Sequence, residues 1–214
     1  MAYYFPEGSK IYFSTTFADA KTVSAVTNAD PAVATSTSHG YSDNDEVLFT
    51  SGWEDATDSV YMVDQQSADT FKLLGLNTAD TTWFSAGSGT GTAQKISSWV
   101  EVPQVLGITS QGGDARFTTV EPLAKRNAVN VPTGFNPTSI NLTLAHDPAN
   151  ANYQAMQTVA RSLTKVAFKL VLSGGATAYG YGYMNVNEMP SLNRNQVNSV
   201  AASISLLGRM VSYA

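Results

Sequence analysis

The sequence predicts a mainly β protein, in which a β-barrel or sandwich carries one flanking α-helix and a small antiparallel β-barrel is inserted into it. Three observations lead to this prediction. Short runs of β-branched and aromatic residues recur between turn residues, apolar and polar side chains alternate in several of these runs, and one segment has helical spacing. The chain has 214 residues and is 43% apolar, which is enough for a sizeable buried core.

The first expected strand, residues 10–14, precedes a change in composition that marks an inserted unit. From Asn28 onward, Asp, Asn and Gly separate short strand-like runs at the close intervals typical of a small barrel. We therefore predict an inserted acidic domain at residues 27–96 and a discontinuous larger domain at residues 1–26 and 97–214. The strands expected in the insert are residues 46–50, 59–63 and 70–74.

Longer strands are expected after Trp99, and one segment among them is the helix. Asp147 is the expected N-cap and Pro148 the first helical residue, because a capping side chain followed by proline favours a helix start. A shared apolar face places the helix at about residues 148–163, with Tyr153, Met156, Ala160 and Leu163 on that face. The expected strands are residues 100–108, 127–131, 139–144, 166–172, 177–186 and 196–213.

Charged side chains are scarce and unevenly distributed. They make up 14% of the chain, against about 25% in typical soluble domains. Residues 22–95 hold ten acids and two bases, whereas the rest of the chain holds seven acids and ten bases, and the net charge is −5. The chain contains no Lys/Arg cluster, which argues against a protein that reads nucleic acid sequence.

The composition also limits the chemistry and the location of the protein. With no cysteine, the chain has no disulfide, thiolate nucleophile or cysteine zinc site. We expect neither an export signal nor a membrane segment, because the N-terminal residues have no basic region before an apolar stretch and no run of about 18 apolar residues occurs. We expect no catalytic site, no metal and no cofactor.

Candidates for nucleophilic or phosphate chemistry are few. The chain has two histidines, and we interpret both as structural, because His39 lies in a turn and His146 precedes the predicted helix. The glycines of residues 87–91 resemble a phosphate-binding loop, but no Gly-Lys-Ser/Thr follows and no helix begins there. We therefore predict a flexible connector at residues 87–91.

Two acidic groups in the insert have alternative interpretations. Asp43, Asp45 and Glu46 could begin a calcium loop, but Leu48 occupies the position that requires glycine, so we favour a solvated turn. The second acidic group consists of Glu54, Asp55 and Asp58. These carboxylates would suit a glycosidase only if the fold brought them into a cleft.

Three tyrosines share one face of the strand predicted at residues 177–186. Tyr179, Tyr181 and Tyr183 could form a stacking platform for sugars, since flat rings pack on the apolar faces of pyranoses. Alternatively, the rings pack against the helix while Gly180 and Gly182 let another backbone or subunit approach closely. We favour packing.

Five segments occur in an order that suggests one family. They are residues 6–15, 99–105, the helix from Asp147, 182–191 and 196–209. Together they resemble the major tail tube protein of long-tailed (siphovirus-type) bacteriophages. The insert has a likeness of its own, because residues 28–35, 38–42, 45–47 and 69–73 are similar to a small β-barrel module of phage tail proteins and ubiquitin-activating enzymes. That second likeness implies a shared fold only.

The resemblance implies a tail-tube fold and a structural role, not an enzymatic one. Tail tube proteins of this kind close six copies into a ring through continuous sheet, and the rings stack into a hollow tube that conducts DNA into the host. The implied partners are other copies of the chain, a tape measure protein, tail terminator and distal tail proteins, and double-stranded DNA that passes without specific binding. The implied location is the virion tail, assembled in the bacterial host cytoplasm.

Candidate assembly residues follow from this resemblance and from the strand patterns. A lumen wall without basic residues would not retain DNA, since each phosphate bound by Lys or Arg adds affinity. We predict that the small, weakly polar face of the last run lines the lumen, namely Ser199, Ala201, Ser203 and Ser205. We predict a contact loop between rings at residues 112–123, in particular Gly112, Gly113, Asp114 and Arg116. The acidic insert would decorate the outside of the tube.

Other functions are alternatives at this point. A carbohydrate-binding module or adhesin of β-sandwich type would explain the β content and the abundance of Ser, Thr and Asn, and it would be a monomer that binds glycans. A carboxylate-based glycosidase ranks third, because it needs a cleft. A tail terminator or a capsid-decorating protein would be closer phage alternatives.

Overall fold

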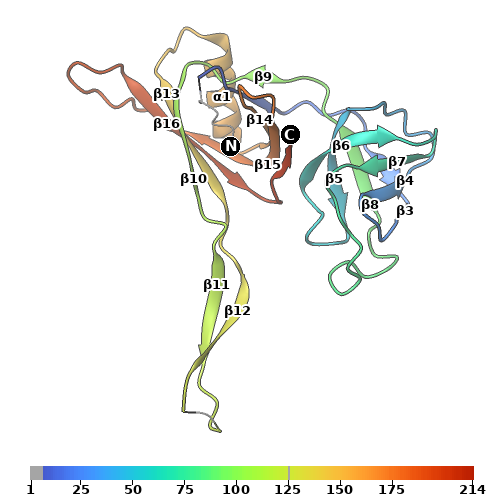
Figure 1. Ribbon diagram of the computed structural model, residues 1–214. Helices are drawn as coiled ribbons and strands as arrows, with labels where there is room; N and C mark the ends of the chain where they lie inside the picture. Colours follow the sequence, from blue (N-terminus) through green and yellow to red (C-terminus); the bar gives the residue numbers. More distant parts are fainter. Residues whose placement is uncertain (1–6, 125) are drawn as a thin grey trace.

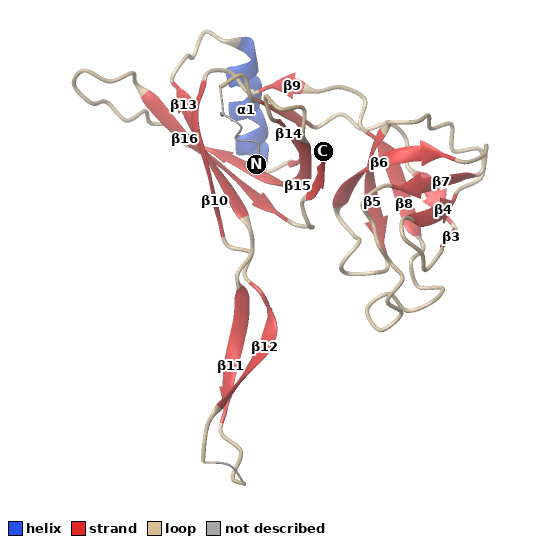
Figure 2. Cartoon of the chain, viewed as in Figure 1, coloured by secondary structure: helices blue, strands red, loops and turns tan. Residues whose placement is uncertain are grey.

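The computed structural model describes residues 7–124 and 126–214, which form two large antiparallel sheets, a projecting two-stranded ribbon and one helix (Figure 1, Figure 2). We call the larger sheet with its helix the body (residues 7–20, 96–111 and 139–214), the smaller sheet the insert (residues 21–95) and the ribbon the arm (residues 112–138). The predicted mainly β fold with one helix and an inserted small barrel is confirmed. Pro6, the first residue of the segment 6–15, lies outside the described residues.

The body sheet has the strand order β10-β13-β16-β15-β14-β1-β9, with β17 paired to part of β15, and it curves into a nearly closed barrel (Figure 1). Its strands pair antiparallel. They are β1 (Lys10–Ser14), β9 (Val100–Glu101), β10 (Val105–Gln111), β13 (Ser139–Ala145), β14 (Lys165–Val171), β15 (Thr177–Val186), β16 (Ser199–Leu206) and β17 (Val211–Tyr213).

Most body strands lie where the sequence places them. The expected strands at residues 139–144, 166–172 and 177–186 match β13, β14 and β15 to within one residue at each end. The strand expected at residues 100–108 is instead divided into β9 and β10, because the chain turns at Gln104, whose φ is 49°. The run 196–213 is divided as well, since a turn separates β16 from β17.

The helix α1 (Ala151–Ser162) starts later than predicted. Its N-cap is Asn150 and not Asp147, because the Asn150 side chain accepts hydrogen bonds from the backbone N–H groups of Asn152 and Tyr153. Asp147 accepts from the N–H of Ala149, so it belongs to the turn before the helix. The Asp-Pro pair therefore marks the approach to the helix and not its first turn.

The apolar face of α1 packs on the body sheet. Tyr153, Met156 and Ala160 are buried, as predicted. Leu163 is 69% exposed, contrary to the prediction, because it is the left-handed C-cap residue and no longer follows the helical face. The body core consists of Ile11, Phe13, Val102, Ile140, Leu142, Leu144, Tyr153, Met156, Ala160, Val166, Phe168, Met184, Val186, Val200, Ala202, Ile204 and Leu206.

The insert closes into a small antiparallel barrel. Its sheet has the order β2-β8-β5-β6-β7-β4-β3. β2 (Lys21–Val23) and β3 (Ala25–Val26) stand at opposite ends of that order but are separated in the chain by Ser24 alone, so one extended segment closes the sheet. The other strands are β4 (Ala32–Thr35), β5 (Glu46–Ser51), β6 (Ser59–Gln65), β7 (Thr70–Leu73) and β8 (Gly91–Lys95).

Two details of the insert differ from the sequence expectation. Because β2 and β3 belong to its sheet, its strands begin at Lys21, earlier than the boundary expected at residue 27. The glycines of residues 87–91 are also more than a flexible connector. A Cβ on Gly89 would lie 2.5 Å from the Trp53 ring, and one on Gly91 would lie 1.8 Å from the carbonyl oxygen of Thr50. These two glycines therefore permit close packing.

Glu46 joins the insert to the body. This residue begins β5, and its carboxylate accepts hydrogen bonds from Lys169 Nζ at 2.6 Å, from the Tyr179 hydroxyl at 2.7 Å and from Trp99 Nε1. Its side chain is 15% exposed, so the interpretation of residues 43–46 as a solvated turn is wrong for Glu46. One carboxylate of the insert thus binds three side chains of the body.

A third apolar core and the C-terminal strand complete the junction between insert and body. Tyr213 of β17 donates a hydrogen bond from its hydroxyl to the Leu74 carbonyl at 2.7 Å and accepts one from the Met62 N–H at 3.0 Å. The core between the two units contains Leu48, Val60, Ile96, Ala167, Tyr179 and Tyr181. The insert is therefore packed against the body and is not merely tethered to it.

We expect the substitution Glu46→Gln to lower the free energy of unfolding by about 2 kcal/mol, because it weakens three hydrogen bonds and leaves the Lys169 ammonium without its carboxylate. The matched control is Glu101→Gln, which breaks the ion pair between Glu101 and Lys10. The Glu101 side chain is 45% exposed and the Lys10 side chain 53%. Exposed pairs contribute about 0–1 kcal/mol. Urea unfolding measures the free energy of unfolding of both variants. An equal decrease in the two variants would contradict the role given to Glu46.

The buried tyrosines predict a loss of stability in alkali. Burial raises the pKa of Tyr41, Tyr61 and Tyr213 from 10.0 to about 12, and it raises the pKa of Tyr179 as well. The unfolded chain releases these phenolic protons at lower pH, so the stabilisation is complete below about pH 10 and is lost as the pH rises toward about 12. Urea unfolding with tyrosinate absorbance measures this, and an unfolding free energy that stays constant over the range would refute it.

Candidate assembly surfaces

The face of the body sheet opposite the helix carries small, uncharged residues on β10, β13 and β16, while the insert covers part of the same face at Tyr179 and Tyr181 of β15. Val200, Ala202, Ile204 and Leu206 of β16 point into the core, so the alternation predicted for this strand is confirmed. The residues predicted for the lumen, Ser199, Ala201, Ser203 and Ser205, therefore share the opposite face. Residues that pair directly on neighbouring strands lie on the same face of a sheet, so the pairing of the strands shows which residues of β10, β13 and β15 continue this face. Thr109, Asn141, Ser203 and Asn185 form one row across four strands, and Gln111, Ser139, Ser205 and Tyr183 form the next.

These two rows contain no acidic or basic residue on β10, β13, β16 and β15, all of which the structure describes. The first charge reached along the second row is Lys165 of β14, which pairs with Tyr183. Its ammonium lies 5.9 Å from the centroid of the Tyr181 ring and 6.0 Å from that of Tyr183. The face presents hydroxyl and amide groups to solvent, and such groups bind phosphates far more weakly than Lys or Arg does.

The strand β10 is a free edge of the body sheet. It ends the strand order, and its outer side has no strand partner among residues 7–124 and 126–214. Ile108 on the apolar side of β10 is 40% exposed, although Leu142, its partner in β13, is 1% exposed. The core is thus open along this edge. A free edge with unpaired backbone groups and uncovered apolar side chains is suited to pairing with another chain.

The arm continues β10 and β13 beyond the body (Figure 1). It consists of β11 (Ala115–Val120) and β12 (Val129–Phe135), which pair with each other. Half of the segment predicted as a contact loop at residues 112–123 is therefore a strand. Gly112 and Gly113 form the base of the arm with φ of 84° and 79°, and a Cβ on Gly112 would lie 2.0 Å from the Pro137 carbonyl oxygen. Glycine is needed there for both reasons.

The arm is held by hydrogen bonds between its own two strands. The Asp114 carbonyl accepts a hydrogen bond from the Asn136 N–H, and Arg116 Nε donates to Thr133 Oγ1. Phe117, Val120, Leu123, Val129, Val131 and Phe135 are each at least 40% exposed. An isolated two-stranded ribbon is marginally stable in water. The arm therefore presents apolar surface that this chain does not cover.

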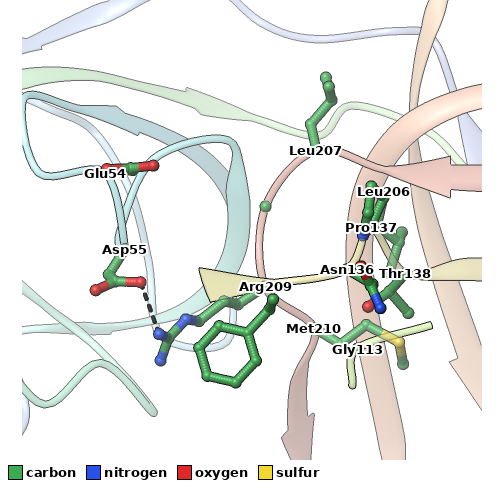
Figure 3. A pocket seen from close by; sticks show the side chains of 12 residues that line it. Glu54, Asp55, Gly113, Asn136, Pro137, Thr138, Leu206, Leu207, Arg209 and Met210 are labelled. Atoms are coloured by element: carbon green, nitrogen blue, oxygen red, sulfur yellow. Dashed lines mark ion pairs between the residues drawn. The ribbon is translucent and has the colours of Figure 1, made fainter. Parts of the chain in front are cut away.

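A cavity of about 550 Å³ lies where the insert, the base of the arm and the turn after β16 meet (Figure 3). It is lined by Glu54 and Asp55, by Gly113 with residues 135–138, and by residues 206–210. Two acids of the group considered for a glycosidase thus do reach a cavity. Asp55, however, forms an ion pair with Arg209 at 2.6 Å, and Asp58 is not among the lining residues.

Both histidines have structural partners, as predicted. His39 is 2% exposed, and its Nδ1 accepts a hydrogen bond from the Tyr41 N–H at 2.9 Å, so its Nε2 donates to the Ser67 carbonyl. His146 Nδ1 lies 3.0 Å from the Tyr153 hydroxyl. In the described part of the chain, no group of three or more His, Cys, Asp or Glu residues could hold a metal ion. The described helix is also too short and polar to cross a bilayer.

The tyrosines of β15 pack against the insert and not against the helix. Tyr179 is 2% and Tyr181 8% exposed, because both belong to the core between insert and body. The prediction that these rings pack within the protein is confirmed, but the predicted partner, the helix, is wrong. A Cβ on Gly182 would lie 1.9 Å from the Ser205 carbonyl oxygen, so this glycine admits β16 of the same chain. Only Tyr183 of the three is substantially exposed, which removes the stacking platform proposed for sugars.

Comparison with known protein families adds an independent observation. A family described as "Phage tail tube protein, TTP" matches residues 51–214 of the chain. The match contains the arm and the body from β9 onward, and it begins within the insert at the last residue of β5. No curated protein matches the chain.

Proposed function

The chain belongs to the phage tail tube protein family, whose members are structural components of the virion tail, and on this premise we propose that it is the subunit of the DNA-conducting tube. Six copies close into a ring, and rings stack around a continuous lumen through which DNA passes into the host. The tape measure, tail terminator and distal tail proteins are the partners we propose by analogy with the family. The uncharged face of β10, β13, β16 and β15 is the observation that carries the proposal.

Ring closure is the role we assign to the free edge of β10. A neighbouring copy that adds a strand there would pair the backbone groups of β10 and cover Ile108, which its own chain leaves 40% exposed. The same contact repeated around an axis gives a closed ring. Oligomerisation would thus complete the apolar core along this edge.

The lumen is the role we assign to the uncharged face, including Ser199, Ala201, Ser203 and Ser205. DNA binds proteins chiefly through phosphate contacts with Lys and Arg, and each such contact adds affinity by releasing counterions. A wall of hydroxyl and amide groups lets the duplex slide, because it offers no site at which the duplex would be held. This function needs no catalytic group, so we propose that the protein is not an enzyme.

Stacking is the role we assign to the arm, with Gly112, Gly113, Asp114 and Arg116 at its base. Its exposed apolar side chains would be covered by a copy in the adjacent ring. The insert would stand on the outside of the tube, and because it covers Tyr179 and Tyr181 on the face of β15 that continues the proposed wall, this arrangement requires the sheet to curve away from the lumen beyond β16. Its excess of acids would keep finished tubes apart.

The substitution Ser203→Lys tests the lumen. It places an ammonium group in every copy on the proposed wall, so we expect normal tubes in negative-stain electron microscopy but DNA delivery lowered on the order of tenfold. The measurement is infectivity of phage whose tube gene carries the variant. The control is Ser88→Lys in an exposed loop of the insert, which should leave infectivity unchanged. Unchanged infectivity with Ser203→Lys would remove this residue from the lumen.

Shortening the arm tests its role in stacking. Replacing residues 113–137 by a tight turn removes exposed residues for the most part, so we expect the free energy of unfolding to change by less than about 1 kcal/mol. Rings should still close through β10 but should no longer stack, which electron microscopy and sedimentation would show. Tubes of normal length formed by the shortened protein would contradict the assignment.

A further inference from the structure

We propose that the tip of the arm of one copy inserts into the cavity at the base of the arm of the next copy along the tube. The inference rests on the proposed function, in which copies stack, and it identifies the surface that receives the arm. The occupant is therefore a second copy of this chain. The receiving surface is the cavity lined by Glu54, Asp55, the arm base and residues 206–210.

The cavity is a preformed site with apolar and acidic parts. Phe135, Leu207 and Met210 line it and are 67%, 44% and 39% exposed, so apolar surface is available there. Figure 3 shows Glu54 and Asp55 on one side, with Arg209 between them and the residues of the arm base and the turn. Asp55 is neutralised by Arg209, whereas Glu54 makes no ion pair among the described residues. One carboxylate is thus free to bind a cation.

Contacts between the insert and the turn after β16 hold two walls of the cavity together. A Cβ on Gly208 would lie 2.2 Å from the Asp58 carbonyl oxygen, so the turn after β16 lies directly against the insert. The Arg209 N–H donates to Ser59 Oγ at 3.1 Å, and the Arg209 side chain pairs with Asp55. Because the insert is also bound to the body through Glu46, these two walls are joined to the body by polar contacts.

The tip of the arm has the complementary chemistry. Leu123 is fully exposed, at 109% of its reference area, and is the most exposed of the large apolar side chains of the chain that the structure describes. Arg126 is exposed three residues further on and has no ion pair among the described residues. A leucine followed by an arginine suits a cavity that offers Leu207 and Met210 beside an unpaired Glu54.

The geometry of the arm makes this contact repeat in one direction. The cavity lies at the base of the arm and the tip lies at its far end, so a tip-to-base contact is heterologous and leaves a free tip and a free cavity at the two ends of every stack. Residues 113–123 are mostly extended, so at about 3.3 Å per residue the contact separates successive rings by roughly 35 Å. The rest of each arm then lies along the next copy, which covers its exposed apolar side chains.

Introduced cysteines test the contact directly, because the natural chain contains none. In the full-length double variant with Leu123→Cys and Met210→Cys, mild oxidation of assembled tubes should give a disulfide-linked ladder of trimers and larger species on non-reducing gels. Each single variant should give dimers at most. The matched control combines Leu123→Cys with Trp83→Cys, whose side chain is 72% exposed in the insert, and should give no ladder.

Two outcomes of the cysteine experiment would overturn the inference. Tubes of normal appearance without a ladder would show that the tip does not reach the cavity, while the proposed function would stand. A ladder from Leu123→Cys combined with Leu192→Cys, in place of Met210→Cys, would assign the tip to the loop at residues 187–198, where Leu192 is 69% exposed. Wild-type protein that forms no tubes would instead refute the proposed function.

A charge exchange tests the same contact without thiols, in case a cysteine variant fails to assemble. Arg126→Glu should lower the yield of tubes about tenfold or more, because the repulsion recurs in every copy of a ring. Combining it with Glu54→Arg should restore tubes. Combining it with Asp19→Arg, an exposed acid of the body, should not. Equal recovery in both combinations, or none with Glu54→Arg, would overturn the pairing of tip and cavity.

Discussion

A strand at the margin of a sheet carries a row of backbone N–H and C=O groups that need partners, and this constraint governs the whole molecule. The insert satisfies it internally, because the segment from β2 to β3 closes its barrel. The body does not, since β10 has no outer strand partner among the described residues and its Ile108 is partly uncovered. The arm has two such margins, because β11 and β12 pair only with each other in the described sheets. One chain thus combines a closed unit with surfaces that the described part of the chain leaves open, which suits a subunit of an open-ended assembly.

The junction between insert and body fixes where these surfaces lie relative to each other. Glu46 accepts hydrogen bonds from three body side chains, and the surrounding apolar core includes Tyr179 and Tyr181. The C-terminal strand contributes Tyr213, which binds two backbone groups of the insert. The acidic insert is therefore packed against the body, and a cavity lies between the insert and the arm base in the monomer. A subunit with fixed contact surfaces can assemble with a single geometry.

The sequence predicted those parts of the fold that local patterns determine. β15 and the two faces of β16 were found because alternation along a strand depends on neighbouring residues alone. In the arm, the strand predicted at residues 127–131 overlaps β12, whereas β11 was missed because its apolar residues Phe117 and Val120 lie on opposite faces and face solvent, which leaves no regular period. The helix start was placed at Asp147 because Asp-Pro is a strong local signal, whereas the cap at Asn150 depends on the turn before it. The role of Glu46 could not be predicted, since Lys169 lies 123 residues away. The cavity was missed for the same reason, because its walls come from three distant segments.

We propose that the body completes its sheet with strands of neighbouring copies around a hole lined by uncharged residues. A helical reconstruction of assembled tubes by cryo-electron microscopy would reveal these contacts. We expect β10 to be hydrogen-bonded along its outer side to a strand of the adjacent copy, with Ser203 and Asn141 facing an open channel. A ring in which β10 faces solvent, or in which this face is turned outward, would contradict it.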